Sequence, residues 1–418
     1  MAEFRPLFGS YLLSTIGDEL ARVALTVLVF QRTQSTLLSA ITFAISYLPW
    51  IVGGPVLAAL ADRLPRHRVL IASDVARAVL VAGMALPGMP LALLLALLLL
   101  VSLCSPPFEA ARSALMADVL EGDRYAVATS LTGISTQIAQ LVGFLLGGAL
   151  LVQFSPSACL LLNAATFAVS AVWLTLRLQR RPAPADTAGE VATLWRDTAS
   201  GVRLVASAPR LLAIVGVLWV AALFVNAPEG IATPLALQLQ GTTAATGVLL
   251  AAGPAGTVLG GVVVGRFCPP HVRERLLAPL VALSLGGVLL AGLVPVWLGT
   301  GAGALGLVLA LLFLAGIGGA CSIPLNVAFV QAVPSAYRGR AFGVAAAGLA
   351  GVQGLGAVLA GLGAEALRPS TVVALSGGIG LVAVVVPLLG LRRTRPRSDG
   401  GDTAHVAPAP DPGGPSTS

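Results

Sequence analysis

Twelve apolar stretches alternate with short polar connections along the chain. They cover residues 8–30, 36–60, 69–86, 91–116, 125–152, 158–176, 211–238, 244–265, 276–294, 304–330, 341–364 and 371–391. At about 1.5 Å per helical residue, each stretch is long enough to cross most of a hydrocarbon core of roughly 30 Å. The pattern therefore predicts an all-α polytopic membrane protein with twelve transmembrane helices.

Composition and an internal repeat extend this prediction. Charged residues make up 10% of the chain, whereas about 25% is usual in soluble proteins. Val119 to Arg124 resembles Val333 to Arg338, and in the span that follows each segment Gln140 matches Gln353 after a one-residue slip. Parallel repeats of six spans are typical of one transporter architecture, with the substrate route between the halves. We expect two pseudo-symmetric six-helix halves, residues 1–176 and 211–391.

The segments outside the two halves are polar. Residues 177–210 form a predicted cytoplasmic linker, in which 190–206 has the spacing of an amphipathic helix lying on the membrane surface. Residues 392–418 are rich in Pro, Gly, Ser and Asp and are predicted to be a disordered cytoplasmic tail. A monomer is the default expectation for this architecture.

The arginines predict the orientation in the membrane. Of the 25 basic residues, all of them arginine, twenty lie in the N-terminal tail, the even-numbered connections and the C-terminal tail. Only Arg32 and Arg368 lie in the opposite loops. The positive-inside rule then places both termini in the cytoplasm and the protein in the inner membrane. Because the arginines are dispersed over loops, the basic pI does not indicate a nucleic-acid partner.

The chain lacks the residues that several kinds of chemistry require. Without lysine there is no Walker A loop to bind ATP and no amine for a Schiff-base cofactor. The three histidines lie in loops or the tail, and the four cysteines have no metal-ligand spacing. We predict no metal, no cofactor and no catalytic residue. An intramembrane serine protease is the alternative from another functional class. Gly133-Ile134-Ser135 is the only segment that resembles a protease motif, and no predicted span contains a histidine to serve as the base.

Charged residues within the spans are the first candidates for function, because each costs several kcal/mol in lipid unless it is paired or solvated. Asp18, Glu19 and Arg22 lie near the middle of the first span. Asp18 and Arg22 stack at i and i+4, and Glu19 and Arg22 at i and i+3. Arg22 can neutralise one acid and leave the other to bind a proton or a cationic substrate. The sequence does not decide which acid titrates, and a structural ion pair is the alternative.

Further polar residues within spans complete this set. Glu109 and Arg112 follow Pro106 and Pro107, which are expected to bend or break the fourth span. Glu229 follows Pro228 in the seventh span and is expected to face the same cavity as the first-span acids. Asp74 and Arg77 are interpreted as structural, because they follow Arg68 by only six to nine residues and are therefore expected near the cytoplasmic interface. Three glutamines are possible hydrogen-bonding groups of the cavity, namely Gln137, Gln140 and Gln353.

One loop carries a resemblance to a known family. The segment from Ala58 to Arg68 contains Asp62, Arg63 and Arg66. It resembles the loop of the major facilitator superfamily that reads Gly, three residues, Asp-Arg, one residue and Gly-Arg, with alanine and Pro65 at the usual glycine positions. Four neighbouring phrases are similar to the branch that contains enterobactin and macrolide exporters: Gly17-Asp18, Gln31-Arg32-Thr33, Ile71 to Arg77 and Ala111 to Leu115.

The resemblance implies an alternating-access carrier that exports a small hydrophobic or amphipathic molecule by proton antiport. It also implies that Arg112 takes part in proton coupling. Asp62 and Arg63 would belong to a conformational latch in which Asp62 caps the helix starting near Arg340, and Arg66 would pair with Asp118. A nutrient importer of the same fold and a non-transporting receptor are the remaining alternatives. An ordinary topogenic loop also accounts for the arginines.

Overall fold

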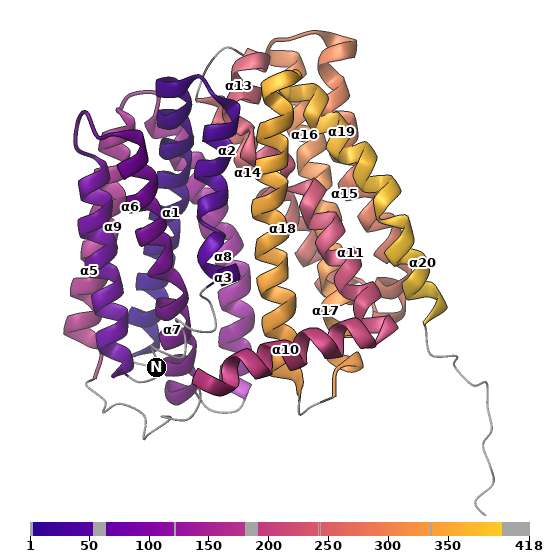
Figure 1. Ribbon diagram of the computed structural model, residues 1–418, viewed down its shortest axis with the longest axis horizontal. Coiled ribbons are helices and arrows are strands. Elements are labelled where there is room, and N and C mark those ends of the chain that lie inside the picture. Colours follow the sequence, from indigo (N-terminus) through magenta and orange to yellow (C-terminus); the bar gives the residue numbers. More distant parts are fainter. Residues whose placement is uncertain are drawn as a thin grey trace, which may run out of the picture.

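The computed structural model describes residues 3–52, 64–120, 123–179, 191–240, 242, 244–334 and 337–394. Within these ranges the regular structure is helical, with no strand. Two groups of roughly parallel helices stand side by side, the N-terminal half in purple and the C-terminal half in orange and yellow (Figure 1).

Each predicted apolar stretch corresponds to one helix or one run of helices. The N-terminal half contains α1 (Phe4–Thr33), α2 (Thr36–Ile45) with α3 (Leu48–Val52), α5 (Arg66–Met84), α6 (Leu91–Leu103) with α7 (Ser105–Val119), α8 (Asp123–Leu150) and α9 (Pro156–Arg177). The C-terminal half contains α11 (Pro209–Val225) with α12 (Ala227–Gly230) and α13 (Ala232–Gln240), α14 (Ala245–Val262) with the π-helix η1 (Val263–Phe267), α15 (Pro270–Leu298), α16 (Ala302–Gly318) with η2 (Gly319–Cys321) and α17 (Ser322–Ala332), α18 (Arg338–Ala366), and α19 (Pro369–Ala383) with α20 (Val385–Arg393).

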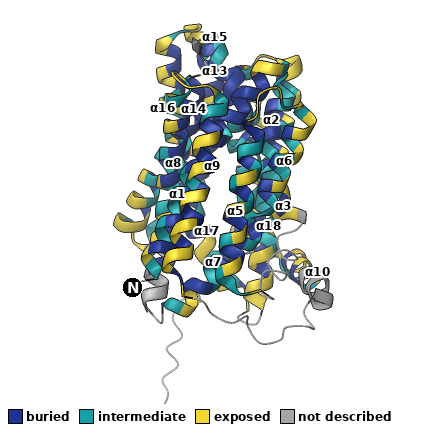
Figure 2. Ribbon diagram, turned by 90° about the vertical axis from the view of Figure 1, so that its left-hand side faces the viewer, coloured by how far each residue is buried: buried dark blue, intermediate teal, exposed yellow. Residues whose placement is uncertain are grey.

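Length and composition identify membrane spans among these helices. Nine of the described segments are long and apolar enough to cross a membrane. The other three stretches are α1 and α5, which carry charged side chains among their apolar ones, and the second stretch, of which residues 53–63 are not described. Large apolar side chains such as Val79, Leu176 and Val386 are exposed, which is typical of a surface that contacts a membrane. Exposed residues, in yellow, occur along the outer helices (Figure 2). The predicted all-α polytopic fold is confirmed.

Prolines break two of the spans, the fourth as expected and the seventh without having been predicted. In the fourth span α6 ends at Leu103 and α7 begins at Ser105, with proline in its first turn. In the seventh span Pro228 occupies the first turn of the short helix α12. Proline lacks the backbone N–H that a continuous helix would use, so each break falls at the preceding residues. These breaks place Glu109 and Glu229 just after a new helix start.

Helix α10 (Val191–Ser207) crosses the end of the protein at which the N-terminus lies (Figure 1). Its Gly201 packs so closely on α18 that a Cβ would meet the Arg340 carbonyl oxygen and the Val344 side chain. We call this end of the protein the α10 end, and the opposite end, where α1 passes into α2 and α18 into α19, the Glu365 end. Residues 180–190 of the predicted linker and 395–418 of the predicted tail lie outside the described residues.

The two halves touch mainly towards the Glu365 end. There α2 packs on α18, with Gly361 against Ala40, and α8 packs on α14, with Gly148 against Gly247. At the other end of α18, a Cβ on Gly343 would meet nothing within 4 Å, and Phe342 is exposed. Small residues at these contacts allow the helix backbones to approach closely.

The contact between α8 and α14 generates a stability prediction. A Cβ on Gly148 would lie 2.9 Å from the Ala244 carbonyl oxygen and 2.9 Å from the Gly247 Cα, whereas one on Gly133, in the same helix, would meet nothing within 4 Å. Gly148→Ala should lower the thermal unfolding midpoint in detergent, because overpacking costs about 1–3 kcal/mol. Gly133→Ala, the matched control, should leave the midpoint unchanged or raise it, since alanine favours a helix by up to about 1 kcal/mol. Equal midpoints for the two variants would contradict the close packing.

Candidate functional site

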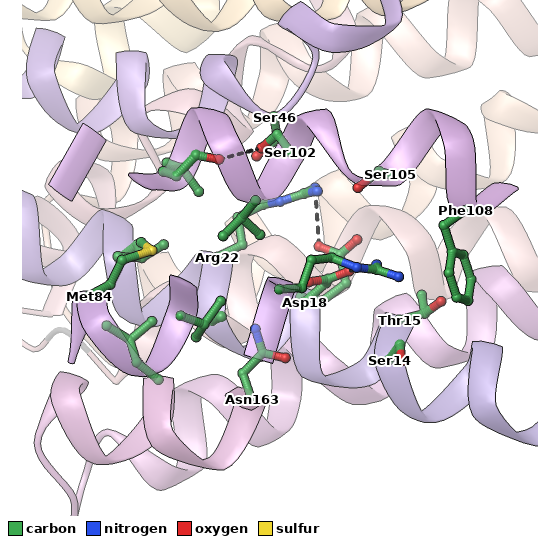
Figure 3. A pocket seen from close by; sticks show the side chains of 18 of the residues that line it. Ser14, Thr15, Asp18, Arg22, Ser46, Met84, Ser102, Ser105, Phe108 and Asn163 are labelled. Atoms are coloured by element: carbon green, nitrogen blue, oxygen red, sulfur yellow. Dashed lines mark hydrogen bonds and ion pairs between the residues drawn. The ribbon is translucent and has the colours of Figure 1, made fainter. Parts of the chain in front are cut away.

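Two cavities in the described part of the protein are lined by charged side chains. The first, of about 390 Å³, is enclosed by the N-terminal half alone, chiefly by α1, α5, α6, α7 and α9. Asp18 and Arg22 extend into it from α1, and Phe108, Met84 and Asn163 line its walls (Figure 3). Further wall residues are apolar, among them Leu98, Val101 and Leu160. The first cavity thus combines a charged floor on α1 with apolar walls.

Asp18 faces an arginine from another helix. Arg77 on α5 donates to the Asp74 carboxylate, with 2.7 Å between Nη2 and Oδ1, and its Nη1 lies 3.9 Å from Asp18 Oδ2. The Asp74 side chain is fully buried and also accepts a hydrogen bond from Ser170. In contrast, 36% of the Asp18 side chain is exposed. Because Asp18 lines the cavity, it remains accessible to a ligand there.

Two aromatic rings also contact the Arg77 guanidinium group. Its guanidinium carbon lies 4.4 Å from the Phe108 ring centroid and 4.5 Å from that of Phe167. Contacts at these distances are cation–π interactions, which gain strength when the cation is desolvated. The position of Arg77 is therefore fixed by its close ion pair with Asp74 and by two aromatic rings. Its contact with Asp18 is the longer of its two ion pairs.

Glu19, the neighbouring acid, pairs with Arg22. Arg22 Nη1 lies 3.1 Å from Glu19 Oε2, and the guanidinium group also lies 5.2 Å from the Phe43 ring centroid and 5.9 Å from that of Tyr47. A Cβ on Gly143 of α8 would collide with the Glu19 side chain, so this glycine lets α8 approach the pair. The sequence allowed Arg22 to pair with Asp18 or with Glu19. The structure forms the pair with Glu19, at i and i+3.

Glu109 and Arg112 form a local ion pair at the border of the first cavity. Arg112 Nε donates to Glu109 Oε2 over 3.0 Å, and Nη2 contacts the second carboxylate oxygen. The Arg112 guanidinium also lies 4.2 Å from the centroid of the Tyr11 ring, whose hydroxyl hydrogen-bonds Thr136 at 2.9 Å. Glu109 lines the cavity and Arg112 is buried. The coupling role of Arg112 stays a prediction.

The second cavity, of about 200 Å³, lies between the halves. The N-terminal half contributes Tyr47, Gln137 and Gln140, and the C-terminal half contributes Glu229 and Gln353. The structure thus brings the three predicted glutamines together with Glu229. Arg22 interacts electrostatically with Glu229 as well as with Glu19 and Asp18, so it connects the charges of the two cavities.

The residues of the predicted latch are only partly described. Asp62 and Arg63 lie outside the described residues. Arg66, at the start of α5, forms an ion pair with Asp118 at the end of α7 and donates to the Ala114 carbonyl oxygen over 3.3 Å. Because both partners belong to the N-terminal half, this pair does not join the two halves.

The structure corrects the position expected for Asp74 and Arg77. Counting from Arg68 placed them near the interface, but α5 begins at Arg66 and Arg77 lies about 16 Å along a helix of 19 residues. Arg77 lines the first cavity and faces Asp18. Asp74 and Arg77 are spaced at i and i+3, as Glu19 and Arg22 are. This spacing was the sequence signal that could have indicated a buried ion pair. Asn163 and the tyrosines Tyr11 and Tyr47 were not anticipated. Among the described residues, no group of three His, Cys, Asp or Glu side chains forms a potential metal site.

Comparisons with known proteins agree with this architecture. The chain is 28% identical over 369 residues to YfiS of Bacillus subtilis (strain 168), an uncharacterized MFS-type transporter, covering 85% of this chain and 86% of the relative. Its fold is similar to that of a POT family transporter solved in complex with 5-aminolevulinic acid, with a TM-score of 0.73, 14% identity and coverage of 93% and 96% of the two chains. It is also similar to the nucleoside transporter NupG, with a TM-score of 0.72, 13% identity and coverage of 93% and 99%.

A family model matches most of the length of the chain. The matching model describes the Major Facilitator Superfamily, and it covers residues 7–302, from the first span into the second half. Together with the helical fold and the cavity between the halves, this match establishes that the chain belongs to the Major Facilitator Superfamily of transporters.

Proposed function

We propose that the protein exports a small hydrophobic or amphipathic compound across the cytoplasmic membrane in exchange for protons. The observation that carries this proposal is the balance of charges around the two cavities. Five carboxyl groups share three guanidinium groups there: Asp18, Glu19, Asp74, Glu109 and Glu229 against Arg22, Arg77 and Arg112. An uncompensated carboxylate within a membrane protein is costly, so the surplus acids favour binding of protons or of a cationic substrate.

The pairing separates the acids into two groups. Asp74 pairs closely with Arg77, at 2.7 Å. Glu109 pairs closely with Arg112, which contacts both of its carboxylate oxygens. The ion pair of Asp18 with Arg77 is longer, at 3.9 Å, and Asp18, Glu19 and Glu229 share the charge of Arg22. We therefore assign the exchangeable protons to Asp18, Glu19 and Glu229, and the structural pairs to Asp74 and Glu109.

The lining of the first cavity supports an amphipathic substrate. Its volume of about 390 Å³ falls in the range of small-molecule pockets, roughly 300–1,000 Å³. Leu98, Val101 and Leu160 provide an apolar wall, and Asp18 and Glu109 provide accessible carboxylates. A compound with an apolar body and a polar or cationic group suits this combination better than a sugar, which needs many hydrogen-bonding partners.

The arginine distribution supports placing the α10 end in the cytoplasm. Arg66, Arg203, Arg273 and Arg340 lie at this end, and cytoplasmic loops carry an excess of such residues. With this orientation the halves contact each other on the outer side, which corresponds to an inward-facing conformation. In that state the substrate enters the cavities from the cytoplasm.

A nutrient importer of the same fold is the second candidate. The second cavity favours it, because Gln137, Gln140, Gln353 and Asn226 offer amide groups to a polar solute. The POT family and nucleoside transporters share the fold at 13–14% identity, which bears on architecture alone.

Replacing the surplus acids tests the export proposal. In everted vesicles with an imposed proton gradient, the wild type should accumulate compounds from a panel of fluorescent amphipathic dyes and antibiotics. Asp18→Asn and Glu19→Gln should each lower gradient-driven accumulation about tenfold or more, because each removes a proton-binding group. Glu274→Gln, near the start of α15 and outside both cavities, is the control and should retain wild-type accumulation.

The same assay distinguishes the alternatives. Accumulation that persists without a gradient, or that both acid variants leave intact, would rule out proton antiport. Gradient-driven uptake of dipeptides or nucleosides into right-side-out vesicles, with no transport of the amphipathic panel, would favour the importer.

A charge swap tests the role of the Arg66–Asp118 pair. The two side chains are 25% and 44% exposed, so the pair should contribute at most about 1 kcal/mol to folding stability. Asp118→Arg should slow transport if the pair controls the position of the loop that precedes α5. Adding Arg66→Asp to Asp118→Arg should restore most of the rate, as measured in the same vesicles. A double variant as slow as the single one would contradict this role.

A further inference from the structure

We propose that Glu365 is the residue that locks the two halves together at the end opposite α10, by capping the first turn of α2. Glu365 lies at the C-terminal end of α18, in the second half, and α2 begins at Thr36 in the first half. This lock goes beyond the proposed exchange of substrate and protons, and it does not depend on which compound is carried.

One carboxylate oxygen of Glu365 accepts three hydrogen bonds from the start of α2. The donors are the Ser35 hydroxyl at 2.7 Å, the Leu37 backbone N–H at 2.9 Å and the Thr36 hydroxyl at 3.0 Å. The Thr36 hydroxyl also lies 3.1 Å from the Gly361 carbonyl oxygen, one turn earlier in α18. All the donors belong to one half and both acceptors belong to the other, so these bonds form only when the halves meet at this end.

The chemistry of a helix start explains why a carboxylate suits this position. The first N–H groups of a helix have no partner within it, and the N-terminus carries a partial positive charge. In α2 the Ser35 side chain accepts from Leu38 N, which satisfies one of these groups, and Glu365 satisfies that of Leu37. A negative charge from the opposite half therefore completes the cap of α2. Below it Gly361 packs against Ala40, which brings the two helices close enough for the contact.

The same pair of spans carries the latch predicted from the sequence. Asp62, which lies outside the described residues, follows the second span and is predicted to cap the start of α18 near Arg340. Glu365 ends α18 and caps the start of α2. The second span would thus place Asp62 on the first turn of α18 at the α10 end. At the opposite end, α18 places Glu365 on the first turn of α2. Because the halves close at one end at a time, the two caps would alternate and stabilise opposite conformations.

Distance measurements between spin labels test this lock without any substrate. Labels on Leu86→Cys and Trp297→Cys report the Glu365 end, and labels on Leu64→Cys and Phe267→Cys report the α10 end. All four side chains are exposed. The background chain has its four native cysteines replaced. Pulsed electron paramagnetic resonance then gives the distribution of distances for each pair.

Removing the carboxylate should shift the population of conformations. For Glu365→Ala we expect the longer distances between labels 86 and 297 to gain about fivefold in population relative to the shorter ones, a change typical of a lost helix cap. The distances between labels 64 and 267 should shorten. Glu365→Gln keeps an acceptor oxygen without the charge and should give a smaller shift. Arg368→Ala, which changes an exposed charge three residues further on, is the matched control and should leave both distributions unchanged.

Thr36→Val provides a second, independent variant. It removes one donor to Glu365 and the bond to Gly361 without changing the side-chain volume greatly, and it should shift the populations in the same direction as Glu365→Ala. Folding of each variant is checked by its elution profile in size-exclusion chromatography. Unchanged distance distributions in folded Glu365→Ala, or in folded Thr36→Val if the first variant does not fold, would overturn the lock. Because no substrate is present, that result would leave the export proposal untouched.

Discussion

The need to neutralise charged side chains inside the N-terminal bundle determines how its helices are arranged. Arg77 is buried at the centre of α5 and can lie there only because Asp74, Asp18 and two aromatic rings surround it. These partners come from α1, α5, α7 and α9, so a single guanidinium group ties four helices together. Gly17 lets α1 approach α9, since a Cβ there would collide with Asn163 and Thr166. The first cavity is the space that remains around this cluster.

Contacts between the halves follow a different principle from contacts within the N-terminal half. The charged group around Arg77 joins helices of that half, whereas glycine and alanine contacts join it to the C-terminal half, as at Gly148 and Gly361. Packing of small residues depends on shape and requires no charged group. Polar interactions between the halves occur as well, between Arg22 and Glu229 and in the hydrogen-bonded group around Glu365, which lies at the exposed edge, where water can replace its bonds. This division allows each half to move as a unit.

The sequence was sufficient for the helices but not for their partners. Apolar length located the described helices, and Pro106 and Pro107 located the break in the fourth span, because both signals are local. Spacing along one helix made Glu109–Arg112 and Glu19–Arg22 candidate pairs, and the structure forms both, but spacing alone left Asp18–Arg22 as an equal alternative. It could not show that Asp18 faces Arg77, because that contact depends on how α1 packs against α5. Glu365 gave no sequence signal for the same reason, as an acid at a helix end also suits an exposed loop.

The position of Arg22 suggests how protons and conformation are coupled in the proposed exchange. Arg22 interacts with Glu19 on its own helix and with Glu229 in the other half. When the halves change their relative orientation, the distance from Arg22 to Glu19 stays the same while the distance to Glu229 changes. The Coulomb interaction between two charges falls with their separation, and it does so most strongly where the dielectric constant is low. In the proposed exchange, Glu229 would therefore have a compensating cation in one conformation and lack it in another, where a bound proton would neutralise it. A single arginine shared between the halves would then make proton binding depend on which end of the protein is closed.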